Sequence, residues 1–149
     1  MNIRDRFTRG FLAGLAAGIV MNIFSFISFA LNWVEIRFLD WAGVLIFGRQ
    51  PVGALEIAVS LAGQLFFTSL LGVFFAYLIS MTTSRGYILK GLVYGLAVWF
   101  ASYAISILFR VPTLVRFRLD TVTSNIVGAL LFGLVLAVAL KWLDEQVKV

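Results

Sequence analysis

Apolar positions gather in four runs, each long enough to cross a bilayer as a helix. A spanning helix needs roughly 20 mostly apolar residues, because each residue adds about 1.5 Å to its length. The runs lie at 10–31, 57–79, 88–109 and 122–140. Helix is favoured over strand because lipid-facing backbone must satisfy its own hydrogen bonds. The pattern predicts an all-α integral membrane protein: a four-transmembrane-helix bundle forming a single domain over residues 1–149.

A shorter apolar segment, residues 33–48, separates the first two spans. It is too short to cross a membrane, it contains Asp40, and Trp33 and Trp41 flank its charged residues. Tryptophan is typical of the headgroup level of a bilayer. We therefore expect an interfacial or re-entrant segment here. Pro51 ends it, because proline disfavours helix in the preceding residue.

Two parts of the chain repeat each other at fixed offsets. Residues 9–16 read RGFLAGLA, and residues 90–97, which lie 81 positions later, read KGLVYGLA. A second series matches at an offset of 61 positions: Pro51 with Pro112, Gln64 with Asn125, and Gly72 with Gly133. The repeat predicts two hairpins of like orientation, related by a pseudo-twofold axis along the membrane normal. Chance similarity in a chain rich in Gly, Ala and Leu is the alternative.

The composition agrees with a lipid environment and excludes several chemistries. Hydrophobic residues make up 62% of the chain and charged residues 13%, against about a quarter charged in soluble domains. His and Cys are both absent, which removes thiolate nucleophiles, imidazole acid–base chemistry and the usual zinc ligands. We expect no cofactor and no metal.

The basic residues lie between the apolar runs and set the expected orientation. The net charge of +5 indicates contact with anionic membrane lipids and not with nucleic acid. Seven of the twelve Lys and Arg residues, including all three lysines, lie on the N-terminal side of the membrane. We therefore expect both termini in the cytoplasm. A cleaved signal peptide is the alternative for the first run, although the run is longer than usual for one.

Small residues at helical spacing predict close helix packing. They are Gly10, Gly14 and Gly18 in the first span and Gly91 and Gly95 in the third. In lipid, small residues let helix backbones approach closely. The contact is either within the chain or the face of a homodimer.

Polar residues inside the spans are candidates for a stripe between helices: Asn22, Glu56, Ser60, Gln64, Thr68, Ser102 and Asn125. Such groups form hydrogen bonds between helices or line the path of a polar solute. A path for ions usually contains charged groups at mid-membrane, whereas Glu56 and Lys90 both lie near helix ends.

A cluster of charged residues maps to the opposite side from the termini: Arg37, Asp40, Arg49, Arg110, Arg116, Arg118 and Asp120. Arg116 and Asp120 are spaced for a helical ion pair. Arginine forms bidentate contacts with carboxylates and with phosphates. The cluster is therefore either a set of ion pairs that holds down the interfacial segment or a site for an anion or lipid headgroup. Neither interpretation places a nucleophile beside a general base, so we expect no catalytic residue.

Several short motifs carry a family resemblance. They are RGFLAG at 9–14, FLDW at 38–41, LIFG at 45–48, KGLVYGLAVW at 90–99, and Asp120-Thr121 before a Gly-rich last span. Over most of its length the chain resembles the YqhR-type conserved membrane proteins of spore-forming Firmicutes. The resemblance implies a bacterial cytoplasmic membrane and four spans, and it supplies no catalytic residues.

The abundance of packing motifs and the scarcity of reactive groups favour a non-catalytic subunit or scaffold that acts through helix packing. A homo-oligomer or another membrane protein would then be its partner. Two alternatives stay open: a small oligomeric transporter or channel for a polar solute, and a protein that binds lipid headgroups.

Overall fold

The computed structural model describes residues 5–82, 86–111, 113–114 and 117–147, which form five helices. In chain order these are α1 (Arg6–Ala30), α2 (Phe38–Phe47), α3 (Gly53–Met81), α4 (Tyr87–Leu108) and α5 (Leu119–Val147). All except α2 are long and apolar enough to cross a membrane. The predicted all-α membrane fold with four spans is therefore confirmed.

Helices α1 and α5 extend beyond their apolar runs into polar residues. The Asp5 carboxylate accepts a hydrogen bond from the backbone N–H of Thr8 at 3.0 Å and so caps α1 before the apolar run begins. This bond is the main cause of a lowered Asp5 pKa, because it stabilises the ionised form. α5 likewise runs past the apolar segment to Val147.

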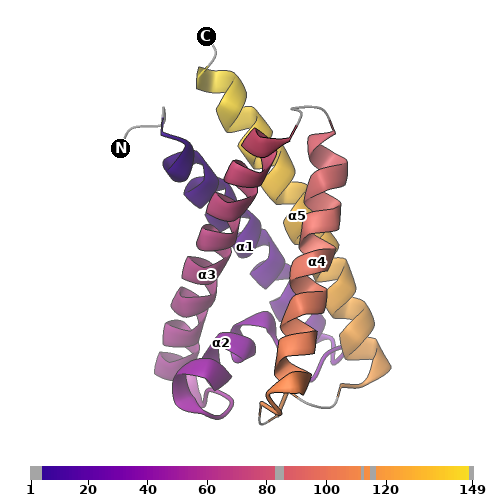
Figure 1. Cartoon of the computed structure of the whole chain (residues 1–149). Helices are drawn as coiled ribbons and strands as arrows, with labels where there is room; N and C mark the ends of the chain where they lie inside the picture. The colour runs from indigo at the N-terminus through magenta and orange to yellow at the C-terminus, as the bar shows by residue number, and fades with distance from the viewer. Residues whose placement is uncertain (1–4, 83–85, 112, 115–116, 148–149) are drawn as a thin grey trace.

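α2 occupies the segment expected to be interfacial. At its start, Asp40 Oδ2 accepts a 2.7 Å hydrogen bond from the backbone N–H of Arg37. At its end, Gly48 adopts a φ of +71°, a left-handed conformation that favours glycine. Figure 1 shows α2 at the end of the molecule opposite to the two termini. We call these the α2 end and the termini end.

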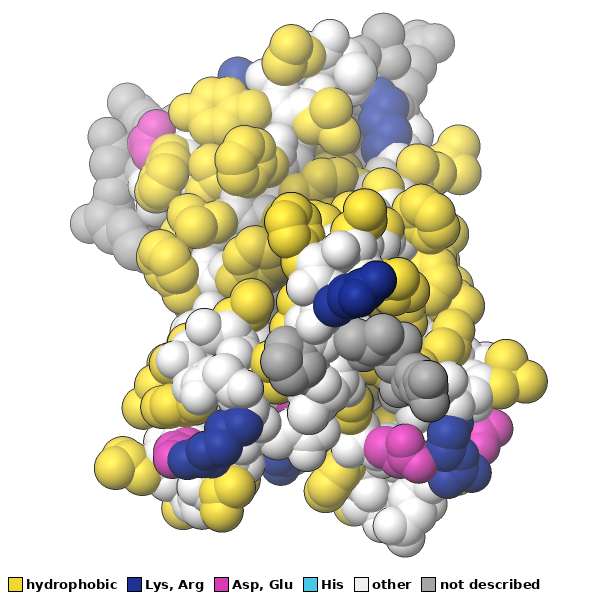
Figure 2. Space-filling model, turned by 60° about the horizontal axis from the view of Figure 1, so that its bottom comes forward, with side chains coloured by type: hydrophobic (Ala, Val, Ile, Leu, Met, Phe, Trp, Pro, Cys, Tyr) yellow, Lys and Arg dark blue, Asp and Glu magenta, His cyan; other side chains and the backbone are white. Residues whose placement is uncertain are grey.

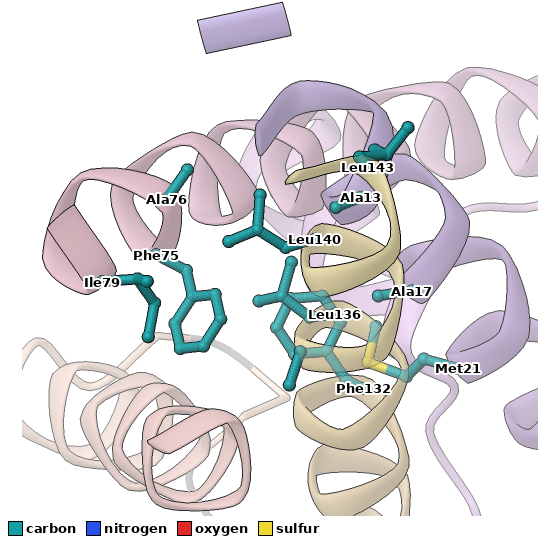
Figure 3. Close-up of a cluster of buried hydrophobic side chains, with 11 residues drawn as sticks. Ala13, Ala17, Met21, Phe75, Ala76, Ile79, Phe132, Leu136, Leu140 and Leu143 are labelled. Carbon is teal, nitrogen blue, oxygen red and sulfur yellow. The ribbon is translucent and has the colours of Figure 1, made fainter. Parts of the chain in front are cut away.

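The long helices pack in the order α3, α1, α5, α4. Side chains from α1, α3 and α5 form the main apolar core, with Ala13, Phe75 and Leu136 fully buried (Figure 3). α4 contributes little to this core and packs almost entirely on α5. The bundle is therefore built from two helix pairs, α1 with α3 and α4 with α5, joined through α1 and α5.

The two helix pairs make equivalent contacts at the positions that the repeat aligns. A Cβ atom on Gly14 would overlap the carbonyl oxygen of Thr68, and one on Gly95 would overlap that of Ala129. Thr68 and Ala129 are 61 positions apart, as are Gly72 and Gly133, which meet Gly10 and Gly91. The glycine positions in both pairs allow backbone-to-backbone contact. The matched contacts therefore support two repeated hairpins.

The symmetry of the repeat is broken on one side of the bundle. A twofold relation would pair α1–α5 with α4–α3, yet α1 and α5 pack extensively while α3 and α4 hardly touch. The helix without a counterpart, α2, packs on α3. Separation of α3 from α4 is what creates the cavity described next.

Candidate functional site

A cavity of about 390 Å³ lies between α2, α3 and α4, with α5 behind it. This volume falls in the range of about 300–1,000 Å³ that is usual for small-molecule sites. The lining side chains are almost all apolar or aromatic, and none of them is charged. The arrangement suits an uncharged, lipophilic molecule.

Aromatic side chains pack next to the cavity on its termini side and on its α2 side. On the termini side, the Tyr94 hydroxyl donates a 2.8 Å hydrogen bond to the carbonyl oxygen of Leu71, and the Tyr94 ring lies 5.1 Å from that of Phe75. On the α2 side, Trp41 lies 5.2 Å from Tyr103 and 5.6 Å from Phe117, centroid to centroid.

The cavity reaches the outside of the bundle on its lipid-facing flank. Four of its lining residues are also largely exposed: Leu45 (76%) and Ile46 (49%) on α2, Phe67 on α3 (49%) and Ile105 on α4 (54%). All four are apolar, and they lie on helices whose exposed faces are apolar as well. A molecule dissolved in the bilayer could therefore enter sideways without crossing a polar barrier.

Most hydroxyl groups along the cavity are satisfied within their own helix. Thr68 donates to the carbonyl oxygen of Leu65 at 3.0 Å, and Ser102 donates to that of Val98 at 2.8 Å. Ser106 donates in the same way to Ser102 at 2.9 Å. These groups are not aligned toward a shared polar path, because each is turned back on its own backbone.

Gln64 is the exception among the polar lining residues. Its side chain lines the cavity although the residue is only 8% exposed, and no hydrogen bond joins its amide to any described residue. An unpaired amide in an apolar environment costs free energy. Gln64 therefore lacks a partner in this cavity, as do the buried indole N–H groups of Trp41 and Trp99, which have no hydrogen-bond partner among the described residues.

The other residues of the expected polar stripe are dispersed. Asn125 donates a 2.8 Å hydrogen bond to the Tyr103 hydroxyl, whereas Asn22 donates to Gly18 on its own helix. Ser60 is buried and has no hydrogen-bond partner among the described residues. Glu56 lies in the first turn of α3 and is ion-paired, so it does not face the other spans.

Charged residues at the α2 end form ion pairs within the chain. Figure 2 shows basic and acidic side chains next to one another there. Arg37 contacts Asp40 at 2.9 Å, Arg49 contacts Glu56 at 2.8 Å, and Arg118 contacts both Glu35 and Asp120. Arg110 is exposed at the turn after α4, with a φ of +48°. Arg116, expected to pair with Asp120, lies outside the described residues.

Of these pairs, only Arg37–Asp40 is well shielded from solvent. Its side chains are 13% and 4% exposed, and the Arg37 guanidinium also lies 4.7 Å above the Phe29 ring. This contact fastens the start of α2 against the end of α1.

Sequence analysis did not select the aromatic cavity residues Trp99 and Tyr103. The sequence contains a signal for these two residues, because the internal repeat is broken at their positions. At an offset of 81 positions, Trp99 and Tyr103 stand where the first hairpin has Gly18 and Asn22. Large rings in α4 replace small or amide side chains in α1, and these rings line the cavity.

Neither metal chemistry nor a known relative defines this site. The residues described in the structure contain no cluster of acidic side chains suited to a metal ion. No protein-family model, curated protein or solved structure matches the chain. The function must therefore be argued from the cavity itself.

Proposed function

We propose that this chain is a non-catalytic membrane protein that binds a lipophilic molecule taken directly from the bilayer. The observation that carries the proposal is the apolar cavity between α2, α3 and α4, which reaches the lipid-facing flank of the bundle. We place the protein in a bacterial cytoplasmic membrane with both termini inside, on the strength of its Lys and Arg distribution and its family resemblance.

The alternatives are less well supported by the same geometry. The glycines expected to allow close helix packing make their contacts within the chain. A scaffold protein would therefore lack the glycine face that was expected to bind its partner. The hydroxyls along the cavity are bonded to their own helices, which disfavours a path for polar solutes. The arginines in ion pairs at the α2 end are less available to headgroups.

Tryptophan fluorescence provides a direct test, because Trp41 and Trp99 both line the cavity. Trp33→Phe and Trp142→Phe would remove the two exposed indoles and leave the cavity pair as reporters. In lipid nanodiscs, para-bromo-decylbenzene should quench this fluorescence along a saturable curve. Simple partition into the lipid would instead give quenching that rises without saturation.

A matched pair of variants on α4 separates cavity binding from contact with bulk lipid. Val98→Phe adds bulk to the cavity wall, whereas Val93→Phe adds the same bulk at an exposed position outside it. We expect Val98→Phe to abolish the saturable component and Val93→Phe to keep it. Identical quenching curves for both variants and for the Trp33→Phe/Trp142→Phe protein from which they are made would refute the proposal.

A further inference from the structure

We infer that the bound molecule carries an uncharged ring oxygen, as in a quinone or a phenol, and that the Gln64 amide hydrogen-bonds to this oxygen. The inference rests on the proposed function and names the chemical class of the ligand. Three observations lead to it: the unpaired amide of Gln64, the way the repeat-related amide is satisfied, and the aromatic walls of the cavity.

The depth of Gln64 excludes an ordinary lipid headgroup as its partner. Gln64 lies seven residues after Ile57, where the apolar run of α3 begins, which is roughly 10 Å along the helix. The hydrocarbon core of a bilayer is about 30 Å thick, so the amide lies well inside it. A plain alkyl chain at this depth would leave the amide unpaired. The ligand must therefore bring its own polar atom into the hydrocarbon layer.

The second hairpin shows how an amide at this position is satisfied. Gln64 aligns with Asn125 in the repeat, and the Nδ2 group of Asn125 donates to the phenol oxygen of Tyr103 at 2.8 Å. The residue that aligns with Tyr103 is Asn22, whose side-chain N–H is bonded to the carbonyl oxygen of Gly18. The first hairpin thus keeps the amide but lacks the ring oxygen, and a ligand can supply it.

The cavity walls suit a flat ring. Trp99 lies 5.1 Å from Tyr103, and Tyr103 lies 5.2 Å from Trp41, centroid to centroid, so three aromatic side chains line one region of the cavity. Aromatic rings favour stacked or edge-on contacts with one another. The absence of charge among the lining residues excludes an ionised ligand, because an uncompensated charge in this environment is very costly. A neutral quinone or phenol with an apolar tail meets each condition.

Three probes with the same tail test the inference: decyl-benzoquinone, decylphenol and decylbenzene. The affinities of decylphenol and decylbenzene are measured in nanodiscs by displacement of para-bromo-decylbenzene from the Trp33→Phe/Trp142→Phe protein. The affinity of decyl-benzoquinone, which itself quenches tryptophan, is measured by its own saturable quenching of Trp41 and Trp99 in the same protein. We expect one or both ring-oxygen probes to bind about three- to tenfold more tightly than decylbenzene, the usual effect of one added hydrogen bond. Comparison of the quinone with the phenol shows which source of ring oxygen is preferred.

Gln64→Leu identifies the group responsible. It should abolish the advantage of the ring-oxygen probes and leave decylbenzene binding unchanged. Ser69→Ala is the control, because its hydroxyl is bonded to Leu65 on the same helix and lies outside the cavity; it should preserve the advantage.

The outcomes distinguish failure of this inference from failure of the proposed function. Equal binding of all three probes, or an advantage that survives Gln64→Leu, overturns the ring-oxygen assignment while cavity binding stands. Absence of saturable binding for every probe overturns both.

Discussion

Arg9 and Asp144 lie 135 positions apart and form an ion pair, with 2.7 Å between the arginine Nε and the aspartate Oδ1. The other carboxylate oxygen accepts a 2.9 Å hydrogen bond from the Tyr87 hydroxyl. One carboxylate therefore joins α1, α4 and α5 at the termini end. Apart from this link and the hydrogen bond from Tyr94 to Leu71 on α3, α4 packs almost entirely on α5. The Asp144 link therefore helps to hold the two hairpins in one arrangement.

Asp144→Asn should destabilise the bundle. The substitution removes the charge that both Arg9 and Tyr87 contact, and we expect the free energy of unfolding to fall by about 1–3 kcal/mol. Unfolding by sodium dodecyl sulfate in mixed micelles measures it. The control is Glu145→Gln at the exposed Lys141–Glu145 pair, 3.8 Å apart, where a change of less than about 1 kcal/mol is expected. Equal effects would argue against a bridging role for Asp144.

Gly91→Ala should disrupt the α4–α5 contact. A Cβ atom at Gly91 would overlap the backbone carbonyl oxygen of Gly133, and overpacking of this kind costs about 1–3 kcal/mol. Gly63→Ala is the matched change, because its Cβ would meet the flexible Cδ1 atom of Ile46 at 3.1 Å and the Cβ atom of Ala42 at 3.8 Å, and no backbone atom. There the better helix propensity of alanine, up to about 1 kcal/mol, should leave stability unchanged or slightly raised. Thermal unfolding in detergent compares them, and a similar loss in both would contradict the packing argument.

Asp40→Asn should loosen α2. The Asp40 carboxylate is nearly buried and accepts hydrogen bonds from the backbone and the guanidinium of Arg37. Removing its charge should lower the free energy of unfolding by about 2–4 kcal/mol and speed amide hydrogen exchange in α2. Asp120→Asn, at a pair whose side chains are both 64% exposed, should stay within about 1 kcal/mol. Unchanged exchange in α2 would show that Asp40 does not fasten it.

Asn125→Leu and Gln64→Leu should have opposite effects on the ligand-free protein. Asn125→Leu breaks the bond to Tyr103 and should lower the free energy of unfolding by about 0.5–2 kcal/mol. Gln64→Leu removes an amide that has no partner, so stability should be unchanged or increase. Unfolding in detergent freed of apolar additives measures both. A clear loss of stability in Gln64→Leu would mean that the amide has a structural partner.

The sequence anticipated the two repeated hairpins through spacing alone. The offsets of 81 and 61 positions align Gly10 with Gly91 and Gly72 with Gly133, and the structure places these glycines in matching contacts. Spacing is informative here because a helix places residues four apart on one face. The candidate site was only partly anticipated: Gln64 was selected as a polar residue, but Trp99 and Tyr103 were not.

Sequence by itself determined the fold class, the four spans and the segment that contains α2, because a bilayer forces each apolar run to satisfy its backbone hydrogen bonds locally. Only the tertiary structure decided that α1 meets α5 while α3 stands apart from α4, and that Gln64 faces the resulting cavity while Asn125 is bonded to Tyr103. These outcomes depend on packing between helices distant in the chain, including α2 on α3, and local periodicity carries no information about such contacts.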